Sequence, residues 1–126
     1  MSRKRSSDSE GEEEPVLKSQ KSVHYSFVQF LNKTGKKTDV VWVNYHGIGE
    51  LYRTLLPGQF LDINTFVGHP WVFFDSETGD QMVVQLKKVF QPVAWNSDGE
   101  KTPVRKSVTI TLPGKLQINS YCICYS

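Results

Sequence analysis

The chain has 126 residues, a formal net charge of +2, two cysteines and 12% aromatic residues. This length allows one domain with a tail, and such a domain can bury a small core without disulfides. The near-balanced charge gives no overall preference for nucleic acid or anionic lipid. We find no apolar run near the roughly 18 residues of a membrane span and no signal-peptide core at the start. We therefore expect neither a nucleic-acid partner nor a membrane partner.

The first 22 residues differ in composition from the rest of the chain. They carry ten charged side chains and almost no large apolar ones, so burial cannot offset the entropy lost on ordering. We predict a disordered charged tail over residues 1–22, a folded domain over 23–114 and a short tail over 115–126. Both cysteines, Cys122 and Cys124, fall in the last segment, too close together for an unstrained disulfide. A core without disulfides is typical of a reducing compartment, so we expect a location in the cytoplasm and/or the nucleus.

From His24 onward the sequence consists of short runs with β-type alternation, separated by turns rich in Gly, Asn and Asp. The clearest run is the last, in which Val108, Ile110 and Leu112 share one face while Ser107 and its threonine neighbours share the other. No helical period is present. The predicted strands are 24–31, 39–45, 51–55, 59–66, 71–75, 81–86, 87–95 and 106–112. Seven to eight short strands with frequent turns predict an all-β fold, an antiparallel β-sandwich.

The residues that most enzymes require are not gathered in this sequence. The histidines His24, His46 and His69 are far apart, and none begins a metal-binding motif. There is no glycine-rich phosphate loop and no nucleophile elbow. Carboxylates such as Asp62 and Asp75 occur singly. We predict a protein that is not an enzyme, with no catalytic residues, no metal and no cofactor.

One stretch, NTFVGHPWVFFD over residues 64–75, has an unusual pattern for a strand. Pro70 holds His69 in an extended conformation and removes a hydrogen-bond donor from the ladder. That suits an edge or bulge where side chains converge on a surface cleft, with Thr65 and Trp71 beside His69. Each residue also has a plainer reading, because tryptophan is more often core and a lone histidine is usually structural.

Two further aromatic residues precede this stretch. Trp42 lies in a run whose two faces are both apolar, so one face of its ring could be only partly covered. Tyr52 follows a glycine turn on a run too short to bury it deeply. These residues could complete an aromatic pocket, or they could be ordinary parts of the core.

The same residues resemble the β-domain of the von Hippel–Lindau tumour suppressor family in order and spacing. The resemblance covers about residues 15–113 and extends to the flanking segments PVLKS, FLNKT and VTITLP. The matching positions are Trp42–Tyr45, Tyr52, Thr54, Leu55, Pro57, Gly58, Gly68, His69, Trp71 and Phe73.

The resemblance implies a β-sandwich that binds a hydroxylated proline of hypoxia-inducible factor alpha, for oxygen-dependent ubiquitination and degradation. In the family, elongin C and a cullin-type ligase are recruited by a separate helical domain. Carried over to this chain, the hydroxyproline pocket would comprise Trp42, Tyr52, Thr65, His69 and Trp71. The peptide flanking the hydroxyproline would lie along Ile63, Asn64 and Phe66. Threonine at position 65 keeps the hydroxyl of the serine that is frequent in the family and adds a methyl group.

The sequence departs from the family after Pro113, where we expect the elongin-binding helical domain to be missing. Leu116 is followed four residues later by Ser120 rather than by cysteine, and Cys122 comes two positions late. Elongin and cullin binding is therefore doubtful for this chain. Three alternatives stay open: a short form that binds the target without recruiting a ligase, an interaction scaffold with a vestigial pocket, and a carbohydrate-binding sandwich.

Overall fold

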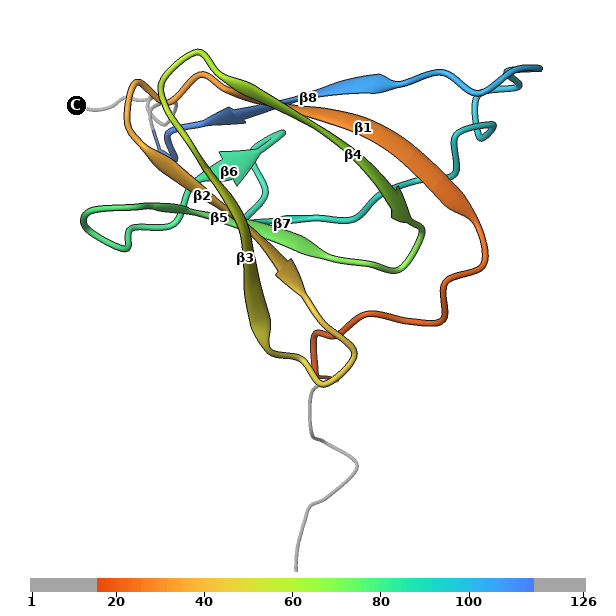
Figure 1. Ribbon diagram of the computed structural model, residues 1–126, viewed down its shortest axis with the longest axis horizontal. Helices are drawn as coiled ribbons and strands as arrows, with labels where there is room; N and C mark the ends of the chain where they lie inside the picture. The colour runs from red at the N-terminus through yellow and green to blue at the C-terminus, as the bar shows by residue number, and fades with distance from the viewer. Residues whose placement is uncertain (1–15, 115–126) are drawn as a thin grey trace, which may run out of the picture.

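The computed structural model of the chain describes residues 16–114, which form eight strands (Figure 1). The eight strands correspond one to one with the eight predicted runs, and the all-β prediction is confirmed. No helix able to cross a membrane occurs in this part of the chain. In chain order the strands are β1 (Tyr25–Asn32), β2 (Thr38–Val43), β3 (Gly49–Leu55), β4 (Phe60–Phe66), β5 (Trp71–Asp75), β6 (Val83–Val84), β7 (Val89–Phe90) and β8 (Lys106–Thr111).

The strands form two four-stranded sheets packed face to face. One sheet has the order β4-β1-β8-β6 and the other β3-β2-β5-β7. All neighbours are antiparallel except β1 and β8, which run parallel from Val28 opposite Lys106 to Asn32 opposite Ile110. The sandwich is therefore antiparallel with one parallel pair. A two-residue alternation fixes which face a side chain takes but not the direction of the neighbouring strand.

The core lies between the sheets and is centred on Phe30 of β1, which is fully buried. Its ring packs against Trp71, Phe73 and Phe90 of the opposite sheet, with centroids 5.2 to 5.6 Å apart. The alternation along β1 is regular, so every second side chain enters this layer. Burying rings of this size contributes about 1.5–3 kcal/mol each, and edge-to-face contacts add to that.

The two runs predicted at 81–86 and 87–95 form strands of only two residues each. They are separated by a tight turn in which Gln85 and Leu86 have φ angles of 53° and 67°. Such left-handed backbone is unfavourable for residues with a Cβ. The turn interrupts the run before a longer ladder can form.

The N-terminal segment (residues 16–22) is seated against the sandwich, although we predicted that the charged tail extends to residue 22. Ser19 is buried; its N–H donates to the Asn44 carbonyl at 2.9 Å and its hydroxyl to the Val43 carbonyl at 2.6 Å. The Gln20 N–H donates to the Gly68 carbonyl at 2.9 Å. The folded unit therefore begins before residue 23, because backbone hydrogen bonds hold a segment that has little apolar surface of its own. Residues 1–15 and 115–126 lie outside the described residues, and with them most of the predicted N-terminal tail and the whole predicted C-terminal tail.

Pro70 does not lie at a sheet edge or a bulge, contrary to our prediction. It is fully buried and immediately precedes β5, a central strand of its sheet. Its carbonyl accepts a hydrogen bond from the Val43 N–H at 3.0 Å. Proline is tolerated here because the residue before the strand does not have to donate a hydrogen bond to the ladder. Gly68, with φ of 84°, makes the turn that carries the chain from β4 across to the second sheet.

Candidate functional site

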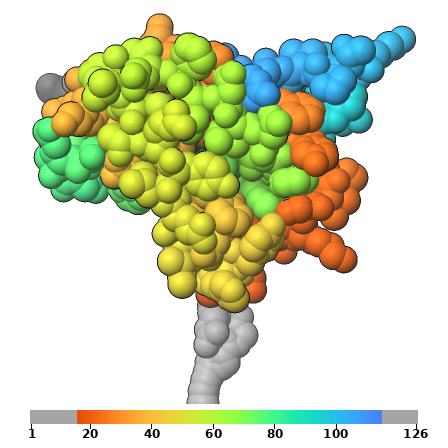
Figure 2. Space-filling view, in the orientation of Figure 1, coloured from red at the N-terminus to blue at the C-terminus, as the bar shows by residue number. Residues whose placement is uncertain are grey.

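The candidate site lies between β3 and β4, which belong to different sheets and diverge from the loop that joins them (Figure 1). Figure 2 shows these two strands side by side on one face of the molecule. Between them is a cavity of about 180 Å³. An apolar cavity of about 150 Å³ can hold a benzene molecule, so this volume suits a single ring. All five predicted pocket residues line it, in the full set Ser22, Trp42, Tyr45, Tyr52, Asn64, Thr65, Phe66, His69 and Trp71.

Thr65 and Trp71 form a buried pair at the base of the cavity. Their exposed fractions are 3% and 2%, and the Trp71 Nε1–H donates to the Thr65 hydroxyl oxygen at 3.1 Å. The hydroxyl thus accepts from the indole and keeps its own hydrogen for another acceptor. The same bond fixes the position of the Thr65 oxygen against the cavity.

His69 is held by the N-terminal segment. Its Nε2 lies 3.0 Å from the Gln20 carbonyl oxygen and 3.1 Å from the Ser22 hydroxyl, with the Tyr45 hydroxyl at 3.4 Å. A carbonyl can only accept, so Nε2 carries the hydrogen and Nδ1 is left as the acceptor of the neutral ring. Burial lowers the pKa of His69 below its ordinary value, and the hydrogen bond to Gln20 opposes this shift. The ring is therefore neutral at pH 7.

The wall of the cavity is aromatic. The Trp42 ring stacks on His69 with centroids 5.6 Å apart, and Tyr52 packs edge-on against Trp71 at 4.8 Å. Tyr52 is 51% exposed and forms the outer rim. Trp42 Nε1 is buried without a hydrogen-bond partner among the described residues. Leaving a buried donor unpaired costs about 1–3 kcal/mol.

The β4 strand forms one side of the cavity and is the edge strand of its sheet. The β1–β4 ladder is flanked by hydrogen bonds from the Asn32 N–H to the Gln59 carbonyl and from the Val67 N–H to the His24 carbonyl, both 2.9 Å. In this register the backbone N–H and C=O groups of the odd-numbered residues from 59 to 67 are hydrogen-bonded to β1. The backbone groups of the even-numbered residues therefore face the open edge.

This alternation separates the three residues predicted to contact a flanking peptide. Asn64 and Phe66 direct their backbone groups to the open edge, and both line the cavity. Ile63 directs its backbone groups toward β1, and its side chain packs against the core. Only Asn64 and Phe66 therefore offer backbone groups to an added strand.

Two lining residues, Ser22 and Tyr45, were not among the predicted site residues. Their hydroxyls are 2.7 Å apart, and both lie close to His69 Nε2. Tyr45 carries a sequence signal, because it belongs to the TrpValAsnTyr stretch that matched the family. Ser22 carries none, since it lies in a polar segment that composition places in the tail.

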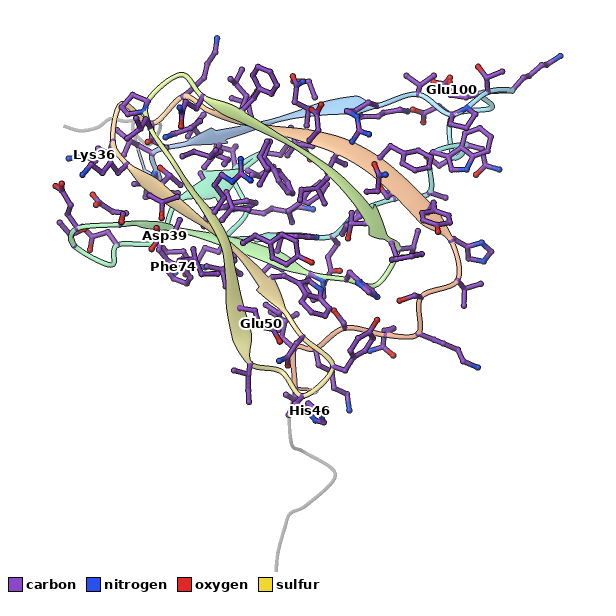
Figure 3. The ribbon with its side chains drawn as sticks, in the orientation of Figure 1. Lys36, Asp39, His46, Glu50, Phe74 and Glu100 are labelled. Carbon is purple, nitrogen blue, oxygen red and sulfur yellow. The ribbon has the colours of Figure 1, made fainter. Side chains whose placement is uncertain are left out.

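His46 and a larger cavity at the other end of the molecule lie outside this site. His46 is exposed in the turn after β2, at the tip of the molecule opposite Lys36 (Figure 3). A larger cavity of about 480 Å³ lies at the Lys36 end, beside Asp75 and Leu112, and contains none of the predicted site residues. Across residues 16–114 no three His, Cys, Asp or Glu side chains are grouped as metal ligands.

The chain is similar to known proteins, among them a family model and a curated relative. Residues 17–99 match the family described as the VHL beta domain. Protein Vhl of Drosophila melanogaster is 33% identical over 93 residues, which cover 69% of this chain and 52% of that protein. The chain thus spans about half the length of this curated relative.

Proposed function

The chain belongs to the von Hippel–Lindau β-domain family, and we propose that it is a non-catalytic recognition module that binds peptides containing hydroxyproline. The observation that supports this most directly is the pairing of a buried hydroxyl with a neutral imidazole in one small aromatic cavity. Thr65 and His69 both line that cavity, together with the rings of Trp42 and Tyr52.

The hydrogen-bond capacities of the two polar groups suit a hydroxyl ligand. The Thr65 hydroxyl already accepts from Trp71, so it would donate to the ligand oxygen. His69 donates through Nε2 to Gln20, so its Nδ1 would accept the ligand hydrogen. Unmodified proline would leave both groups desolvated and unpaired, at about 1–3 kcal/mol each. A selectivity on the order of a hundredfold follows for hydroxyproline over proline.

The aromatic wall would hold the pyrrolidine ring. Trp42, Tyr52 and Trp71 give the cavity rigid apolar surface, and their mutual contacts limit rearrangement. On either side of the ring, the extended peptide would add to the β4 edge, bonding to the backbone of Asn64 and Phe66.

Within the family's role, we propose hypoxia-inducible factor alpha as the target and ubiquitin-dependent degradation as the outcome, in the cytoplasm and/or nucleus. The β-domain would supply the recognition step. Recruitment of elongin C and the cullin ligase would depend on a helical domain, which residues 16–114 do not include.

The proposal is tested by calorimetric titration with two peptides from a hypoxia-inducible factor degradation segment, identical except for 4-hydroxyproline or proline. We expect the hydroxylated peptide to bind about a hundredfold more tightly, and His69→Ala to remove the difference. His46→Ala is the matched control, because His46 is exposed and does not line the cavity. Equal binding of both peptides by a folded sample would overturn the proposal and favour an interaction scaffold.

A further inference from the structure

A second hollow adjoins the proposed pocket on the outer face of the β4-β1-β8-β6 sheet. It has a volume of about 310 Å³ and is lined by Phe27, Asn64, Pro103 and Arg105. Asn64 lines both this hollow and the hydroxyproline cavity. The two sites therefore meet at one residue of the β4 edge, which can place both beside one bound peptide.

Arg105 occupies this hollow in a fixed position. Its Nη1 donates to the carbonyls of Val28 and Ile63 at 2.9 and 3.0 Å, and its Nη2 donates to the Asn64 side-chain oxygen at 2.7 Å. These bonds use three of the five guanidinium N–H groups. Two N–H groups stay available to a ligand, on a side chain that three hydrogen bonds already hold in place.

The charge of Arg105 is not balanced by a carboxylate within residues 16–114. The next residue, Lys106, is placed differently. It bonds to Asp98 and lies 3.6 Å from Glu100, and the Asp98 hydrogen bond is the largest cause of its raised pKa. Of two adjacent cations, one is paired within the fold and the other faces solvent beside the β4 edge.

The geometry of strand addition determines which peptide residues would meet this charge. Cross-strand neighbours share a face of the sheet, so a peptide residue opposite Thr65 would point into the pocket. Its two neighbours would point to the outer face, one beside Asn64 and the other beside Phe66. The Phe66 side is aromatic, because Tyr25 packs on Phe66 with centroids 4.6 Å apart. The Asn64 side carries Arg105.

We propose that Arg105 forms a second subsite that binds an acidic side chain directly adjacent to the hydroxyproline in the peptide. This inference rests on the proposed function of the pocket. The hydroxyproline enters the cavity, the acidic neighbour lies over Asn64 and pairs with the guanidinium, and the other neighbour lies against Phe66. Glutamate is the acidic residue to test first, because its side chain reaches further from the peptide backbone than that of aspartate.

The test uses hydroxyproline peptides with Glu or Gln placed immediately before or after the hydroxyproline, titrated at 50 and 300 mM salt. Both positions are tested because a peptide can add to an edge in either direction. At one position, we expect Glu to bind about 2- to 5-fold more tightly than Gln at low salt, the range for an exposed ion pair. The preference should shrink at high salt, where charges are screened over a few ångströms.

Variants of Arg105 test whether its guanidinium causes the preference for Glu. Arg105→Gln should remove the preference for Glu, and Arg105→Glu should reverse it in favour of a Lys peptide. The reversal in Arg105→Glu still decides the question if Arg105→Gln weakens the pairing of β1 with β4. A Glu preference that persists in Arg105→Gln, or no preference at either position, would overturn the subsite. The ratio of hydroxyproline to proline affinity, measured in the same series, reports separately on the pocket.

Discussion

Replacing Thr65 by valine separates the hydroxyl from the shape of the side chain. The valine keeps the branched volume but cannot accept the Trp71 Nε1–H, which lies 3.1 Å from the hydroxyl oxygen. Because Trp71 is only 2% exposed, water cannot replace the lost acceptor without rearrangement. An unsatisfied buried donor costs about 1–3 kcal/mol, whereas the added methyl group contributes about 0.8 kcal/mol. The net loss of folding free energy should be roughly 1 kcal/mol.

The same substitution should act selectively on binding. The hydroxyproline peptide loses one hydrogen-bond partner, so its affinity should fall by about tenfold, equivalent to about 1.4 kcal/mol. The proline peptide leaves the Thr65 hydroxyl unpaired, and valine has no hydroxyl to leave unpaired, so the affinity for the proline peptide should rise rather than fall. Thr65→Ser should restore the preference for hydroxyproline while losing some stability, because it keeps the hydroxyl and removes a buried methyl group.

Urea denaturation gives the stability change and calorimetry gives both affinities. Thr109→Val is the matched control, since Thr109 lies on the outer face of β8 and its hydroxyl has no hydrogen bond within the described residues. The reasoning is refuted if Thr65→Val keeps the wild-type ratio of hydroxyproline to proline affinity. It is refuted on the structural side if Thr65→Val and Thr109→Val have the same stability change.

Three further outcomes follow from the site and its supports. Burial lowers the pKa of His69 in the folded chain, so the unfolded chain takes up the proton first as pH falls below about 6.5. Thermal melts should therefore show stability decreasing below that pH, and the decrease should be less steep in His69→Gln. Gly68 and Gly58 share a φ of +84°, but a Cβ at Gly68 would lie 3.0 Å from the Gln20 side chain, whereas a Cβ at Gly58 would meet nothing within 4 Å. Gly68→Ala should therefore destabilise the fold more than Gly58→Ala in the same melts. Deleting residues 1–22 should lower both stability, measured in melts, and hydroxyproline affinity, measured in titrations. A deletion that ends at residue 15 is the control, because it keeps every described contact. Equal stability and affinity of the two deletion variants would contradict the role of the N-terminal segment.

The strands could be predicted because side-chain alternation reflects burial directly. In β8, Val108 and Ile110 were predicted to share one face, and both are buried. The parallel pairing of β1 with β8 could not be predicted, since neither strand's alternation encodes the direction of its neighbour. The shortness of β6 and β7 depends on the turn at Gln85 and Leu86, whose left-handed backbone has no glycine to mark it.

The pocket residues were identified by their spacing in a family pattern, and not by any property visible in each residue alone. Trp71 illustrates this, because it is as buried as a core tryptophan and belongs to the core cluster. The prediction of a surface cleft rested partly on Pro70 lying at a sheet edge or bulge, and that reason was wrong. The proline immediately precedes a central strand, and Gly68 makes the turn from one sheet to the other.

The N-terminal segment shows most clearly what composition misses. The composition of residues 1–22 predicts disorder, yet the N-terminal segment holds the polar group on which hydroxyl recognition would depend. The Gln20 carbonyl selects the His69 tautomer, while the Trp71 indole orients the Thr65 hydroxyl. The Thr65 hydroxyl and the His69 ring are thus set as donor and acceptor before any ligand arrives. This reduces the ordering cost of binding. Selectivity for a hydroxyl should therefore depend as much on these supporting bonds as on the two residues that would touch the ligand.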